Sequence, residues 1–374
     1  MKIKEVRATP LLVHYKQPYH WAQGVIDGAE VILVEVETDT GVTGYGECVG
    51  SASSSAVQSL LRMAGDICVG HSPFDNARLM RKAYRALFAA LGTTSAPRFS
   101  GQILAGLEMA LWDIAGKATG RAVHELLGGA VREDVQYFGF PQGDTAEELA
   151  EEARTLAEAG YPVIYVKIGR GEPLDLAIAE QVRAAIGDRR LRLDANEAWD
   201  PLTALRMIRK LAAFDIEFVE QPTNSESLSA LAHVKAASPV AIAADQLVFT
   251  PANVFDVCRQ RAADVIVLGL HETGGIGRFR AAASIAEAAG VNICLHGLYE
   301  TGITTCAANQ AAATLANLDD GNQYMNHLLE EDIIAGPSLE LKDGRLPILQ
   351  GPGLGFELDW DAVGRAAEVH AKSL

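Results

Sequence analysis

The chain contains a repeated unit, an apolar β-rich segment followed by a helical stretch, which begins near residue 135. The candidate strands are VQYFGF, VIYVKI, LRLDAN, EFVEQP, VAIAADQ, DVIVLGL and NICLHG. Because neighbouring parallel strands are joined by crossover connections, strands that alternate with helices predict a parallel sheet. The strands are continuously apolar, which indicates that both faces of the sheet are covered. The repeat therefore predicts an α/β protein, either a (β/α) barrel or an open doubly wound sheet.

The residues near the ends of six successive strands favour the barrel. They recur at intervals of 27, 26, 25, 24 and 27 residues, and most are polar. They are Lys167, Asp194, Glu220, Asp245, Gly269 and His296. In a barrel the carboxyl ends of the strands converge on one face, where active sites form, whereas in an open sheet they would spread along an edge. No GxGxxG dinucleotide fingerprint follows the first strand either.

The segment before the repeat has a different character. Residues 1 to about 50 predict antiparallel strands with a hairpin at Asp39-Thr40-Gly41, and residues 56–126 have helical periodicity. We therefore predict an α+β capping domain over residues 1–126 and a barrel over residues 127–351. The tail breaks the repeat, and we expect it to return to the first domain at about 352–374.

Composition excludes several classes of partner. Of 374 residues, 32 are Lys or Arg and 48 are Asp or Glu, which gives a net charge of −16 and disfavours nucleic acid. No apolar run reaches the roughly 18 residues of a membrane span, and the first residues lack the pattern of a signal peptide. The five cysteines form no CxxC pair, so we expect reduced thiols and a cytoplasmic protein.

Three carboxylates end successive strands and predict a metal site. Adjacent strand ends lie about 5 Å apart, so Asp194, Glu220 and Asp245 would crowd together unless a cation neutralised them. Oxygen ligands without Cys or His favour Mg²⁺, with Mn²⁺ as the alternative. One strand-end Asp alone would more often cap a helix or pair with a basic residue, but three at matched spacing favour the metal.

Lys167 and His296 are the candidate acid and base. A lone Lys is more often a surface charge and a lone His more often a core residue. Beside a metal cluster, however, the pKa of a partly buried Lys would fall and the group would suit a general base. Gly297 and Glu300 follow His296 and suggest an open loop at the same face.

Together these residues and several short motifs resemble the enolase superfamily, in its mandelate racemase and muconate lactonizing branches. The likeness covers nearly the whole chain. The motifs are GVTGYGE at 41–47, ALWDIAGKATGRAVHELLGG, YVKIG, LRLDANEAW, VEQP, AADQ, the pair Gly274-Gly275, and GPGLGFELD.

The resemblance implies a modified TIM barrel under an N-terminal capping domain. It also implies that Mg²⁺ binds a small-molecule carboxylate substrate while Lys167 removes the α-proton to give an enediolate. Asn196 and Gln246, which lie in two of the metal motifs, are expected beside the metal or the substrate. Homo-oligomers, either dimers or octamers, are expected as well.

Three positions depart from the family pattern. Tyr165 replaces the first lysine of KxK and is expected to tune specificity. Gly269 replaces the lysine of one branch or the aspartate of the other, so His296 would lack its carboxylate partner. His271 and Glu272 lie just beyond Gly269 and are candidates to compensate.

The reaction stays open between three outcomes. An unassisted imidazole keeps a pKa near about 6.5 and is a poor base, which favours elimination or cycloisomerisation over two-base racemisation or epimerisation. A non-enzymatic relic that binds a carboxylate or metal is a remote alternative. In the cap, Tyr19 and Trp21 suggest an aromatic-lined substrate pocket, although Trp21 could equally pack in the core.

Overall fold

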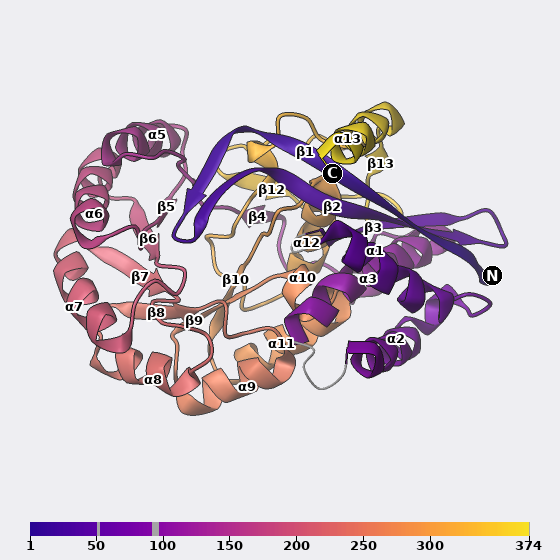
Figure 1. The fold of residues 1–374 in the computed structure, drawn as a ribbon, viewed down its shortest axis with the longest axis horizontal. Coiled ribbons are helices and arrows are strands. Elements are labelled where there is room, and N and C mark those ends of the chain that lie inside the picture. The colour runs from indigo at the N-terminus through magenta and orange to yellow at the C-terminus, as the bar shows by residue number, and fades with distance from the viewer. Residues whose placement is uncertain (51–52, 92–96, 374) are drawn as a thin grey trace.

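The computed structural model describes residues 1–50, 53–91 and 97–373. Its N-terminal part is a three-stranded antiparallel sheet in the order β1-β2-β3 (Figure 1). The strands are β1 (Ile3–Trp21), β2 (Gly24–Thr38) and β3 (Thr43–Val49). Helices follow: α1 (Ser54–Asp66), α2 (Asn76–Leu91), α3 (Pro97–Thr119) and the short α4 (Val123–Leu126).

Strand β2 is buried on both faces because it lies between two cores. Ile32, Val34 and Val36 face α1 to α3, where they pack with Leu61, Leu107 and Leu111. Val31 and Leu33 point the other way and join the large core that continues into the barrel. Successive side chains of a strand point to opposite faces, so β2 contributes to both cores and joins the cap to the barrel.

Two glycines of the GVTGYGE motif allow α3 to lie directly on β3. A Cβ atom at Gly44 would come within 2.2 Å of the backbone oxygen of Ala110, and one at Gly46 within 2.0 Å of that of Gly106. The alternate residues, Tyr45 and Glu47, therefore point away from α3. For Glu47 that direction leads to the barrel helix α12 (Gly302–Ala312), with which it forms hydrogen bonds.

The second part of the chain contains six parallel strands in the order β10-β9-β8-β7-β6-β5, with helices outside them (Figure 1). The strands are β5 (Val163–Lys167), β6 (Arg190–Asp194), β7 (Ile216–Glu220), β8 (Ala241–Ala244), β9 (Val265–Leu268) and β10 (Asn292–Leu295). The covering helices are α5 (Ala146–Glu158), α6 (Glu172–Ile186), α7 (Pro201–Leu211), α8 (Leu228–Ala237), α9 (Pro251–Gln260) and α11 (Ile276–Ala288).

Two irregular segments close this sheet into a barrel. On one side Gly139 bridges to Ile164 of β5, while Tyr137 bridges to Asn322. On the other side Leu318 bridges to Ile293 of β10. The predicted α/β barrel with an α+β cap is therefore confirmed, with two of its walls built from irregular strands.

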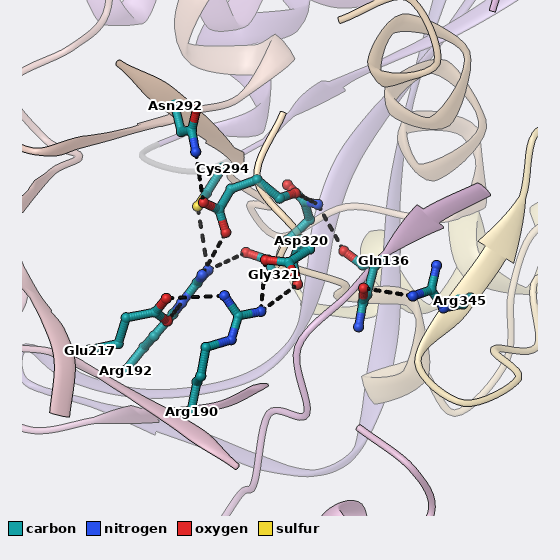
Figure 2. A network of polar contacts seen from close by, with 11 residues as sticks. Gln136, Arg190, Arg192, Glu217, Asn292, Cys294, Asp320, Gly321 and Arg345 are labelled. Carbon is teal, nitrogen blue, oxygen red and sulfur yellow. Dashed lines mark hydrogen bonds and ion pairs between the residues drawn. The ribbon is translucent and has the colours of Figure 1, made fainter. Parts of the chain in front are cut away.

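An arginine network fills the end of the barrel opposite the strand-end residues. Arg192 lies inside the barrel two residues before Asp194, is 1% exposed, and stacks 4.7 Å from the ring centroid of Phe218. Its guanidinium contacts Glu217, Asp319, the carbonyl of Gly321 and, at 3.4 Å, the sulfur of Cys294 (Figure 2). Arg190 lies beside it and pairs with Glu217 and Asp320. Because the charges are paired, this buried network closes the barrel floor without leaving an isolated ion.

The C-terminal segment returns to the cap. Strand β11 (Ile334–Gly336) pairs with β13 (Glu357–Leu358), and helix α13 (Trp360–Ser373) packs against β1. Strand β12 (Arg345–Pro347) pairs with β4 (Asp134–Gln136) near the barrel floor. The domain boundary at residues 126 and 127 stays a prediction. Within the described ranges, no helix is both long and apolar enough to cross a bilayer.

Candidate active site

A cavity of about 80 Å³ lies between the carboxyl ends of the barrel strands and the cap. The cap contributes Tyr19, Trp21 and Gln102 to its lining. The barrel contributes Lys167, Asn196, Gln246, His296, Gly297, Leu298, Tyr299, Gln323 and Met325. Two larger grooves, of about 650 and 680 Å³, run along the surface elsewhere and contain none of the strand-end residues. The small cavity, where the titratable groups converge, is therefore the candidate site.

Lys167 and Tyr165 both contact Asp194. Lys167 Nζ lies 2.6 Å from Asp194 Oδ2, and the Tyr165 hydroxyl lies 2.5 Å from the same oxygen and 3.0 Å from Glu220 Oε1. Tyr165 is stacked on Phe138, with ring centroids 4.3 Å apart, which fixes the direction of its hydroxyl. Tyr165 is not among the described residues that line the cavity, and the expectation that it tunes specificity stays a prediction. Tyr165 joins two carboxylates beneath the cavity floor.

The charges around Lys167 keep it protonated. Burial lowers its pKa, but Asp194, Tyr19 and Glu220 more than offset burial, and the net pKa is raised above 10.5. The predicted lowering therefore does not come from the protein's own groups. A cation at the carboxylates would have to supply it.

The three carboxylates are electrostatically coupled. Burial, followed by the charges of Asp194 and Asp245, raises the pKa of Glu220 well above its ordinary value. Such mutual repulsion, in a donor set of oxygens alone, fits a hard divalent cation. No set of three or more described Asp, Glu, His or Cys side chains is already arranged to hold a metal. The donor chemistry therefore fits Mg²⁺, and Asp194 would be shared between that cation and its contacts with Lys167 and Tyr165.

The backbone immediately beyond β6 and β7 is strained. Asn196, Glu197 and Gln221 have positive φ angles of 41°, 67° and 33°. For non-glycine residues such angles cost on the order of 1–3 kcal/mol each and cluster at functional sites. Hydrogen bonds hold the turns in place: Asn196 N donates to Asp194 Oδ1 at 2.8 Å, and Glu197 N donates to the carbonyl of Gln221 at 2.8 Å.

His296 has the carboxylate partner that the sequence did not predict at position 269. Its Nδ1 lies 2.7 Å from Glu272 Oε1 and 3.8 Å from Asp245 Oδ1. Burial lowers the pKa of His296, but Asp245 and Glu272 more than offset it, and the pKa rises to about 10. The expectation of an unassisted imidazole with an ordinary pKa is therefore wrong.

The other predicted residues divide into two groups. Tyr19, Trp21, Asn196 and Gln246 line the cavity as expected. His271 instead hydrogen-bonds Thr304 at 3.0 Å, and burial lowers its pKa to about 4. Glu300 is buried behind the cavity, where its carboxylate accepts a hydrogen bond from the Leu298 amide. Neither of these two lines the described cavity.

Five lining residues were not predicted from the sequence: Gln102, Leu298, Tyr299, Gln323 and Met325. Gln323 follows Asn322, whose side chain accepts a hydrogen bond from Leu295 N and so joins the irregular last strand to β10. Only Leu298 and Tyr299, two and three residues beyond His296, had a sequence signal that could have revealed them, which is their closeness to that strand end.

Comparisons with known proteins agree with this geometry. Residues 3–128 match the family described as mandelate racemase / muconate lactonizing enzyme, N-terminal domain, and residues 148–362 match the enolase C-terminal domain-like family. Muconate cycloisomerase 1 of Rhodococcus opacus is 33% identical over 97% of this chain and 98% of its own. D-galactarolactone cycloisomerase of Agrobacterium fabrum is 32% identical with the same coverage.

A solved structure extends the comparison. The dipeptide epimerase of Enterococcus faecalis V583, complexed with Mg and the dipeptide L-Leu-L-Tyr, has a TM-score of 0.85 and 28% identity. The match covers 96% of this chain and 100% of that one. The chain belongs to the enolase superfamily, in its mandelate racemase and muconate lactonizing enzyme group. It is an enzyme of the lyase or isomerase type, with the proton-abstraction chemistry of that superfamily.

Proposed function

We propose that Lys167 is the base and His296 the acid in an elimination or cycloisomerisation of a small carboxylate. The observation that carries this proposal is the placement of the two side chains. Both line one cavity, from β5 and from the residue after β10, which are the two ends of the six-stranded order. Between them, Asp194 and Glu220 end β6 and β7, and Asp245 directly follows β8.

Asp194, Glu220 and Asp245 would hold Mg²⁺, or Mn²⁺ in its place. The metal would bind the substrate carboxylate and stabilise the negative charge that develops when the α-proton leaves. The raised pKa of Glu220, caused by burial and then by the charges of Asp194 and Asp245, supports this assignment, because a cation would relieve that repulsion.

Lys167 is positioned for proton abstraction by groups on three sides. Asp194 fixes its ammonium, the ring of Tyr165 lies 5.4 Å from Nζ, and the ring of Phe140 lies 6.0 Å away. Tyr19 reaches down from the cap and contacts the same ammonium. Because Lys167 is 7% exposed, bulk water is excluded once the cap is in place.

His296 suits the acid role for a different reason from the one expected. Glu272 and Asp245 favour the imidazolium, so the ring holds a proton to donate to a leaving hydroxyl or ring oxygen. Its Nδ1 is occupied by Glu272, which leaves Nε2 as the nitrogen available to a substrate.

The cavity lining favours a substrate with one carboxylate and neutral polar groups. Among the described lining residues, Lys167 and His296 are the only ones that carry a positive charge, while Gln102, Gln246 and Gln323 offer amides. A second carboxylate would be buried without a cation, at a penalty of several kcal/mol. We therefore favour a lactone or hydroxy acid, as in the name of the galactarolactone relative, over a dicarboxylate.

The experiment is a screen for α-proton exchange in D₂O with Mg²⁺ present. The panel contains hydroxy acids, aldonic and aldaric lactones, dicarboxylates and dipeptides. Exchange and product formation with a lactone or hydroxy acid, lost in Lys167→Ala, support the proposal. Activity confined to dicarboxylates would contradict the substrate class, and exchange that survives in Lys167→Ala would contradict the base.

Racemisation or epimerisation is the second candidate, and the Glu272 contact favours it. A two-base reaction requires a base on each face of the α-carbon. A carboxylate on Nδ1 lets an imidazole accept a proton at Nε2 and stabilises the imidazolium that results. Inversion of a pure enantiomer without loss of any group would identify this reaction.

We also propose that the protein is a homo-oligomer, either a dimer or an octamer. Large apolar side chains are exposed on both parts of the fold, including Phe255 at 54% and Trp360 at 53%. Such exposure supports association with closed symmetry.

A further inference from the structure

We propose that Glu272 is the positioning residue for His296, and that its carboxylate takes the place of a side chain missing at Gly269. The inference rests on the proposed acid role of His296 and adds the group that orients it. Glu272 is not among the described residues that line the cavity, so its proposed role in the reaction is exerted through the imidazole.

The first support is spatial coincidence. A Cβ atom built on Gly269 would lie 2.0 Å from Glu272 Oε2 and 3.0 Å from its carboxyl carbon. The Glu272 carboxylate therefore occupies the space into which a side chain at the end of β9 would project. Its other oxygen reaches His296 Nδ1 at 2.7 Å.

The short helix α10 (Leu270–Thr273) explains how a residue three positions later reaches that space. Gly269 is the residue that precedes the helix, and Glu272 is the third residue within it. Helical side chains point back toward the N-terminus, and a Glu at the third position folds toward the residue before the helix. The turn of α10 thus places the Glu272 carboxylate beside the end of β9. Only glycine at position 269 leaves room for it there.

Helix α3 of the cap packs against the short helix α10. A Cβ atom on Gly101 of α3 would come within 2.4 Å of the carbonyl oxygen of Glu272, so α3 lies directly on α10. On the other side, the His296 amide donates to the carbonyl of Leu268 at 2.8 Å. Both partners of the Glu272–His296 contact therefore have fixed backbones.

The consequence is a defined orientation for the ring. With Nδ1–H donated to Glu272, the imidazole is held in one tautomer and one rotation, and Nε2 is left for the substrate.

The test moves the carboxylate between the two positions. Glu272→Ala removes it, and Gly269→Ala displaces it, because the new methyl group overlaps its oxygen. Gly269→Asp combined with Glu272→Ala restores a carboxylate at the strand end, where φ of −115° accepts any residue. The controls are Glu287→Ala, an exposed residue of α11, and Gly364→Ala, where a Cβ meets nothing within 4 Å.

The first readout needs no substrate. In ¹⁵N-histidine-labelled protein, a hydrogen bond to a buried carboxylate gives a slowly exchanging, downfield Nδ1–H proton, assigned to His296 by its loss in His296→Asn. We expect this signal in the wild type and both controls, its loss in Glu272→Ala and Gly269→Ala, and its return in the double variant. Its persistence in Glu272→Ala would overturn the inference.

The second readout separates positioning from structure. With a substrate from the panel, we expect kcat to fall on the order of 10²–10⁴-fold in both single variants, with KM nearly unchanged. The double variant should recover most of that loss. Failure of the double variant to regain activity, while it is folded, would show that Glu272 is only structural. If no substrate is turned over by the wild type, the proposed function fails, while the proton signal still decides the role of Glu272.

Discussion

Glu47 of the cap accepts hydrogen bonds from both the amide and the hydroxyl of Thr301, at 3.0 and 2.5 Å, across the boundary between cap and barrel. The same carboxylate accepts from the amide of Thr304 at 3.3 Å. A negative group at the first turn of α12 satisfies amides that have no partner within the helix. Glu47, the last residue of the GVTGYGE motif, thus attaches the cap to the barrel above the strand ends.

Replacing Glu47 should loosen this attachment. We expect Glu47→Ala to lower the free energy of unfolding by about 1–3 kcal/mol, because buried amides lose their acceptor. Urea unfolding measures the change, and Glu158→Ala, an exposed residue at the end of α5, is the control. Equal stability of the two variants would show that Glu47 does not fix the cap.

Glu108 should make stability depend on pH. Burial raises its pKa from 4.5 to about 7, although it accepts hydrogen bonds from Ile276, Gly277 and Trp112. Because the folded pKa lies above the unfolded one, the protonated form is favoured by folding. Its contribution is complete below pH 4.5 and is lost as the pH rises to about 7.

The comparison with Glu108→Gln isolates this effect. As the pH rises across that interval, the free energy of unfolding of the wild type should fall relative to that of the variant. A difference that stays constant with pH would mean that folding does not raise the pKa of Glu108.

Tyr165→Phe should change how the protein responds to Mg²⁺. Without the hydroxyl that joins Asp194 to Glu220, repulsion between the carboxylates is less relieved when no cation is bound. We therefore expect a lower Tm than the wild type in EDTA and a larger rise on adding Mg²⁺. Asp245→Asn should show a smaller rise than the wild type. Identical responses of all three proteins would place the cation elsewhere.

The strand-end residues could be predicted because the β/α repeat sets both their spacing and their shared face. Lys167, Asn196, Gln246 and His296 all line the cavity for that reason. The sequence named Glu272 only as a candidate beside His271, since strand spacing assigns the partner of His296 to position 269 and does not show that the short helix α10 brings the residue three positions later to the same place. Gln102 and Gln323 were missed because they reach the cavity from the cap helix and from the irregular last strand.

Assembly can be tested independently of chemistry. Sedimentation at micromolar concentration should give a homo-oligomer, because the exposed apolar side chains favour association. A single monomeric species would contradict this expectation.

The most direct test of the central claim compares Lys167→Ala with His296→Asn for α-proton exchange in D₂O and for product formation. If Lys167 is the base and His296 the acid, Lys167→Ala abolishes exchange, whereas His296→Asn retains exchange and blocks departure of the leaving group. If His296→Asn instead abolishes exchange of one enantiomer and Lys167→Ala that of the other, the two residues are paired bases and the enzyme is a racemase or epimerase.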